Sequence, residues 1–194
     1  TSIYSLLTEY ASVYGDVVIS IEDPPELPVQ GSYNNRGIWY QVDAVQAGGY
    51  LPAMIAAMRY NPRYIFLGEI RSSETAREAI RAAVNGHLVM STIHGNSIQG
   101  AIFALQQIAL GSETDLGLVR SILGDGLLAV LHQELSFTSL GTRRLKSELL
   151  YVGGVPSMVS KIRSGKLELL SNEIEAQKIM LSKGINLHTH YAST

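Results

Sequence analysis

The sequence predicts an α/β protein in which a parallel sheet is followed by a mostly helical subdomain. Residues 64–67 are a short run of large apolar side chains, as expected of a strand buried on both faces. A helical pattern over residues 76–84 follows, and a second apolar run begins at Leu88. A strand, a helix and a strand at this spacing form a βαβ unit, which predicts parallel strands with right-handed crossovers.

The composition is that of a folded protein. Its 194 residues are 46% hydrophobic and 16% charged, so the chain can bury a core. A net charge of −2 gives no basic field, and no nucleic-acid partner is expected. The absence of cysteine excludes disulfides and fits a reducing compartment. The longest stretch without Asp, Glu, Lys or Arg is interrupted by asparagine, glutamine and histidine, so no transmembrane segment is expected.

The other elements of the first part follow from apolar spacing and from the residues that break it. A helix is expected over residues 3–10, ending at Gly15, and a strand over 17–21, stopped by prolines. Residues 27–37 are expected to form a loop, residues 38–42 a strand and residues 51–60 a helix. The helix after residues 64–67 begins at Ser72 or Ser73, either of which can cap it.

The pattern becomes mainly helical after residue 97. Helices are expected over residues 98–110, 115–131, 155–163 and 172–181, and a hairpin is expected to join 132–138 to 144–152. The predicted domains are an α/β core over residues 1–110 and a helical subdomain with a β-hairpin over residues 111–194.

His188 and His190 have no third ligand nearby in sequence, so they are expected to lie in an irregular tail.

Polar clusters follow three of the predicted strands. They are Glu22-Asp23-Pro24-Pro25-Glu26, Gly68-Glu69-Ile70-Arg71 and Ser91-Thr92-Ile93-His94. The carboxyl ends of neighbouring parallel strands open on one crevice, where such sheets bind ligands. Carboxylates without cysteine suit a hard cation that carries a phosphate and is held largely through water. An apolar strand that ends in an acid indicates a Walker B element; the alternative is that Glu69 caps the next helix.

Three segments resemble a known family. The segments "ISIEDPPE", "YIFLGEIR" and "GHLVMSTIHGNS" are similar, in order and spacing, to the Asp box, variant Walker B and His box of the secretion and type IV pilus ATPases. These are hexameric RecA-like motors of type II and type IV secretion, conjugative transfer and pilus extension or retraction. The resemblance covers nearly the whole chain and implies a RecA-like P-loop NTPase core that uses ATP and Mg²⁺. It also implies a homo-oligomer, expected to be a hexamer, that works in the cytoplasm at the inner membrane with platform or secretion-channel proteins.

The resemblance assigns roles by position. It makes Glu69 the Walker B acid that helps hold Mg²⁺ through water, Glu26 the general base and His94 the sensor of the γ-phosphate. The positions that match further ATP-binding residues are Thr1, Glu22, Asp23, Arg71 and His87. Alternatives stay open: a solvated loop acid for Glu26, structural histidines for His87 and His94, and an ion-pair partner of Glu26 or Glu69 for Arg71.

The main departure from the family is the P-loop. No Gly-x-x-x-x-Gly-Lys-Ser/Thr occurs in the sequence, no lysine precedes Lys146, and the one Gly-Lys pair, Gly165-Lys166, is followed by leucine. In the family, the P-loop leads into a helix much like "TSIYSLLTEY". The P-loop is therefore expected just ahead of Thr1 in a longer protein, and these residues alone are expected to hydrolyse no ATP. Smaller departures, such as Ser72 in place of aspartate, concern the subtype.

The expected function is that of an ATP-hydrolysing motor subunit for a pilus, secretion or conjugation machine. Two alternatives belong to other classes. One is a RecA-like nucleic-acid translocase, which the lack of a basic stripe disfavours. The other is a non-catalytic assembly fragment that only contacts neighbouring subunits.

Overall fold

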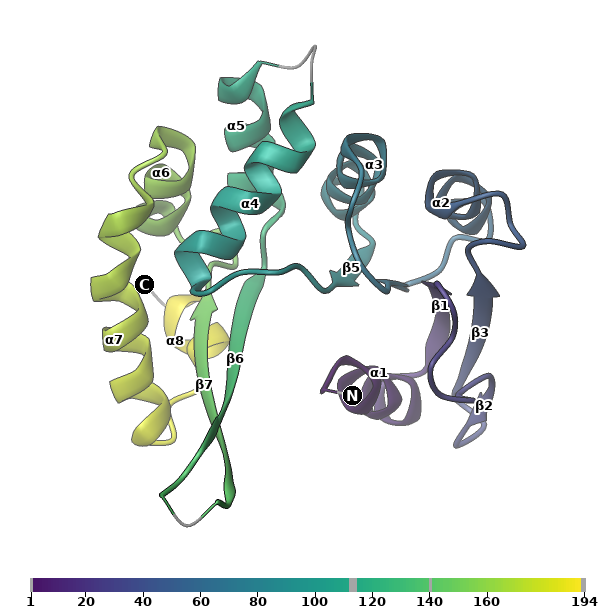
Figure 1. The fold of residues 1–194 in the computed structure, drawn as a ribbon, viewed down its shortest axis with the longest axis horizontal. Coiled ribbons are helices and arrows are strands. Elements are labelled where there is room, and N and C mark those ends of the chain that lie inside the picture. Colours follow the sequence, from purple (N-terminus) through teal and green to yellow (C-terminus); the bar gives the residue numbers. More distant parts are fainter. Residues whose placement is uncertain (1, 112–114, 140, 193–194) are drawn as a thin grey trace. The chain divides into compact units, whose positions relative to one another are not determined.

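The computed structural model describes residues 2–111, 115–139 and 141–192. The chain divides into two compact units, Thr1–Ile93 and His94–Thr194, which are drawn in Figure 1 and described separately below. The boundary predicted from sequence fell after residue 110. In the structure, the helix over residues 98–110 packs on elements that follow it, so the contacts divide the chain earlier.

The first unit is built on a five-stranded sheet. Its strands are β1 (Asp16–Glu22), β2 (Gly31–Tyr33), β3 (Gly37–Asp43), β4 (Tyr64–Leu67) and β5 (Leu88–Ser91). In the strand order β2-β3-β1-β4-β5, only the β2–β3 pair is antiparallel. The predicted α/β class with a mostly parallel sheet is confirmed. Strand β2 was expected to be loop, because three residues are too few to show an alternating pattern.

Three helices cover this sheet. Helix α1 (Ser2–Val13) packs on one face, and α2 (Tyr50–Met58) and α3 (Ser73–Val84) cover the other, as Figure 1 shows. All four residues of β4 are buried, which confirms a strand covered on both faces.

Aromatic side chains fill the layer between α1 and the sheet. The ring of Tyr4 stacks on Trp39 at 6.0 Å and meets the edge of Phe66 at 5.6 Å. Trp39 is fully buried, and its indole N–H donates to the Ser20 hydroxyl at 2.9 Å. The one polar atom of this ring is therefore satisfied. The ring contacts of Tyr4 hold α1 against the sheet.

The second unit combines helices with a two-stranded hairpin. Its elements are α4 (Ile98–Leu110), α5 (Leu116–Gly126), β6 (Ala129–Phe137), β7 (Arg143–Tyr151), α6 (Pro156–Ser164), η1 (Leu167–Leu169), α7 (Leu170–Ser182) and α8 (Leu187–Ala192). The expected hairpin is confirmed by the pairing of β6 with β7. Of the helices in the described residues, none has both the length and the apolarity needed to cross a membrane.

Two expectations about the second unit are wrong. The helix expected over residues 115–131 ends at Gly126, because the apolar residues after it pair with β7. A short apolar run fits a helix or a strand equally well, and here tertiary pairing decides. The expected irregular tail contains α8, in which Leu187 is buried and His188 Nδ1 lies 2.9 Å from the Tyr151 hydroxyl.

The layer under α1 gives a stability test with a matched control. Leu7 is fully buried and Leu6 is 44% exposed on the same helix. Leu7→Ala is expected to lower the free energy of unfolding by about 2–5 kcal/mol, because it leaves a cavity in the core. Leu6→Ala is expected to lower it by about 0.5 kcal/mol or less. Urea denaturation of both variants measures the difference; equal losses would contradict the assigned face of α1.

Candidate active site

The register of the sheet brings two acidic clusters to one edge. In β1, Ile21 lies opposite Leu67 of β4, and the Gly68 N–H donates to the Ile21 carbonyl at 2.9 Å. The residues that follow both strands therefore leave the sheet side by side. We call Glu22, Asp23 and Glu69, at the carboxyl ends of β1 and β4, the acidic edge.

Glu22 is the buried member of the acidic edge, with 3% of its surface exposed. Its Oε2 accepts a hydrogen bond from the Tyr4 hydroxyl, and its Oε1 accepts one from Nε2 of Gln41 at 3.2 Å. Burial raises the pKa of the Tyr4 hydroxyl, and the bond to Glu22 raises it further, so Tyr4 stays a neutral donor. Both oxygens of Glu22 are thus engaged inside the unit.

Glu69 is paired with Arg71. The Nε and Nη2 atoms of Arg71 lie 2.7 and 2.6 Å from Oε2 of Glu69. This hydrogen bond raises the pKa of Arg71. The cap of α3 is Ser72, whose hydroxyl accepts from the Thr75 N–H at 3.2 Å. Glu69 is therefore not the capping residue; it forms an ion pair with Arg71.

Tyr50 was not singled out from the sequence, but it lies close to this site. It is the first residue of α2, and its hydroxyl would lie 3.2 Å from a Cβ atom placed on Gly68. Burial raises the pKa of Tyr50; the negative charge of Asp23 raises it further, as do those of Glu69 and Glu22 more weakly, while Arg71 lowers it. The Tyr50 hydroxyl therefore lies beside Gly68, the residue between β4 and Glu69.

The other predicted site residues lie in different places. Asp23 and Glu26 are exposed on the loop after β1. His87 precedes β5, and its Nδ1 lies 2.7 Å from the Pro62 carbonyl at the opposite edge of the sheet, so the structure does not bring it to the acidic edge. His94 is exposed and is the first residue of the second unit. Thr1 lies outside the described residues.

The acidic edge has the donor chemistry of a hard cation site. Within the described part of the chain, no three His, Cys, Asp or Glu side chains are grouped as a metal site of their own. Mg²⁺ keeps several waters and takes only one or two carboxylates when it is bound with a phosphate ligand. Asp23 and Glu69 follow the neighbouring strands β1 and β4 and provide such carboxylates, so the residue types present fit the ion.

Comparison with known sequences places this arrangement in a family. Residues 1–147 match the sequence profile of the family described as type II/IV secretion system protein. The chain belongs to this family. The resemblance seen in the Asp box, Walker B and His box is thereby confirmed.

Members of the type II/IV secretion system protein family share both sequence and fold with this chain. The type II secretion system protein E of Klebsiella pneumoniae is 38% identical over 118 residues, which are 61% of this chain and 21% of that protein. The type IV pilus assembly ATPase TfpB of Acinetobacter baylyi is 37% identical over 135 residues, 70% of this chain and 21% of that protein. The crystal structure of the pilus retraction motor PilT with bound ADP has a TM-score of 0.80 at 29% identity, covering 91% of this chain and 50% of PilT. The chain thus spans about a fifth of these curated relatives and half of the PilT chain.

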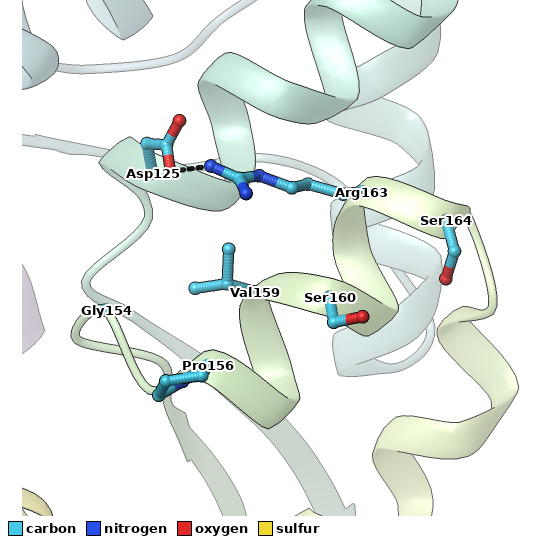
Figure 2. Close-up of a pocket in the computed structure, with 7 residues that line it drawn as sticks. All are labelled: Asp125, Gly154, Pro156, Val159, Ser160, Arg163 and Ser164. Carbon is cyan, nitrogen blue, oxygen red and sulfur yellow. Dashed lines mark hydrogen bonds and ion pairs between the residues drawn. The ribbon is translucent and has the colours of Figure 1, made fainter.

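A separate hollow of about 600 Å³ lies in the second unit. Figure 2 shows its lining residues, which come from the end of α5, the β7–α6 connection and α6: Asp125, Gly154, Pro156, Val159, Ser160, Arg163 and Ser164. Its two charged groups, Asp125 and Arg163, form an ion pair with each other. Among the described residues that line this hollow, no further charged group joins that pair.

The close approach of Tyr50 to Gly68 can be tested by adding a methyl group. Gly68→Ala is expected to lower the free energy of unfolding by about 1 kcal/mol, because the new Cβ crowds the Tyr50 hydroxyl. Tyr50→Phe removes that oxygen, so the same change should cost clearly less in that background. Urea denaturation of the four proteins measures the coupling. An equal loss in both backgrounds would show that Tyr50 is not the neighbour that matters.

Proposed function

We propose that this chain is the part of an ATP-hydrolysing motor subunit that supplies the acidic half of the nucleotide site. The observation that carries the proposal is the acidic edge: Asp23 and Glu69 follow two neighbouring parallel strands at their carboxyl ends, where open α/β sheets bind ligands. Membership of the type II/IV secretion system protein family supports the same activity. The phosphate-cradling Gly-Lys-Ser/Thr loop, absent from these 194 residues, would be needed for hydrolysis.

Each residue has a proposed role. Glu69 helps hold Mg²⁺ through a water molecule, and Arg71 keeps this carboxylate oriented until the ion is present. Glu26, on the loop after β1, accepts the proton of the attacking water, and Asp23 shapes the same pocket. Mg²⁺, when bound, neutralises charge that develops on the phosphates. Glu22 acts from inside the unit, by holding the loop that carries Glu26.

His94 is the proposed sensor of the γ-phosphate, and Thr1 the proposed end of the ATP-binding segment. His87 receives no role at the acidic edge, because it lies at the opposite end of β5. The proposed assembly is a homo-oligomer, a hexamer in keeping with the family resemblance. It would work on the cytoplasmic face of the inner membrane and pass force to a pilus platform or a secretion channel.

The test is ATP hydrolysis by the complete natural protein in which these residues occur. Glu69→Gln is expected to lower kcat about 100-fold or more, because it removes a fixed negative charge from the reacting centre. ATP binding should change little. Steady-state phosphate release and nucleotide binding, each with and without Mg²⁺, measure the two effects.

Glu78→Gln is the matched control. Glu78 lies on α3 and pairs with Arg81 at 3.3 Å, away from the acidic edge, so its loss should leave kcat unchanged. No hydrolysis by the wild-type protein, or full activity in Glu69→Gln, would overturn the proposal. Hydrolysis that requires added DNA would point instead to a nucleic-acid translocase, and a stable oligomer without hydrolysis to an assembly fragment.

A further inference from the structure

One glutamine side chain beside the acidic edge makes every hydrogen bond of which it is capable. Gln41, in β3, donates from Nε2 to Oε1 of Glu22 at 3.2 Å and to the Leu27 carbonyl at 2.8 Å. Its Oε1 accepts from the N–H groups of Val29 and Gln30 at 3.0 and 3.1 Å. A primary amide has two donor hydrogens and two acceptor lone pairs, so its capacity is filled.

All four bonds reach one stretch of chain, the connection that leaves β1. Glu22 stands at the start of this connection and Leu27 five residues further on, and both contact the same nitrogen of Gln41. Residues 23–26 therefore form a loop, and the residues on either side of it both accept a hydrogen bond from Nε2 of Gln41. That loop carries Asp23 and Glu26.

These hydrogen bonds of Gln41 matter because Asp23 and Glu26 lie outside the core. Asp23 and Glu26 are exposed, so packing against apolar side chains does not hold them. Exposed loops are the most mobile part of a fold unless hydrogen bonds tie them to a rigid element. Gln41 belongs to a strand paired on both sides, with β1 and with β2, which is such an element.

We propose that Gln41 is a positioning residue, which closes the loop 23–26 and thereby holds Asp23 and Glu26 at the acidic edge in the geometry that hydrolysis needs. The catalytic part of this proposal rests on the function proposed above; the closing of the loop does not. Of the side chains closest to it in size, only glutamine can make all four bonds at this reach. A glutamate has the same length but no donor hydrogens, a methionine has neither donors nor strong acceptors, and an asparagine is one methylene shorter.

The experiment uses the complete natural protein and the variant Gln41→Met, which keeps the side-chain length and removes all four bonds. Hydrogen exchange at the Val29 and Gln30 amides, followed by NMR or by mass spectrometry of fragments, should become about five- to tenfold faster. The value of kcat for ATP should fall about 10- to 100-fold, because a displaced base reacts poorly. The KM for ATP should stay within about twofold, since binding of the ground state is untouched.

Two further variants make the result specific. Gln107→Met places the same change on an exposed position of α4 and should alter neither exchange nor kcat. Gln41→Asn keeps the amide with a shorter reach and should lie between wild type and Gln41→Met in both measurements. Exchange in β4 reports whether each variant remains folded.

The outcomes distinguish the role proposed for Gln41 from the ATPase function proposed for the chain. If hydrogen exchange at Val29 and Gln30 is unchanged in folded Gln41→Met, the claim that Gln41 closes the loop is wrong. Faster exchange with an unchanged kcat would overturn the positioning role. A wild-type protein that hydrolyses no ATP would instead overturn the proposed function, and exchange would still decide whether Gln41 closes the loop.

Discussion

The carboxylate of Glu22 is buried at the end of β1, and two neutral side chains, Tyr4 and Gln41, donate hydrogen bonds to it. A buried carboxylate that lacked such donors would strongly destabilise the folded state. The two donors come from α1 and β3, elements on either side of β1 in the sequence, so Glu22 is satisfied only when both are in place. The geometry of the acidic edge, and of the loop that leaves it, depends on this one interaction.

Glu69 differs from Glu22 in the kind of partner it has. Its charge is balanced by an arginine that is 71% exposed, whereas Glu22 is held by neutral groups in the interior. Water solvates the guanidinium of Arg71 well, whereas the Glu69 side chain is only 22% exposed. Both oxygens of Glu22 are bonded inside the unit. One acid of the edge is thus held by neutral groups in the interior, and the other is paired with a charged group at the surface.

Local signals account for what the sequence predicted well. The bounds of β4 and α4 were predicted to the residue, since each shows a clear apolar pattern between strong breakers. Glu69 was predicted to lie at the carboxyl end of this strand because it follows the buried run after one glycine. Tyr50 and Gln41 were missed, because their importance comes from the pairing of β3 with β1 and the packing of α2, which bring together residues far apart in the sequence.

The contacts of Gln41 also bear on why the loop after β1 can be both exposed and ordered. A loop acid that must meet water and nucleotide cannot be buried, so its position has to be fixed through the backbone on either side of it. Fastening both ends of a four-residue loop to one amide leaves its side chains in solvent while removing most of its backbone freedom. Ordering the backbone costs about 1–2 kcal/mol per residue, and the four hydrogen bonds of Gln41 help to offset this cost.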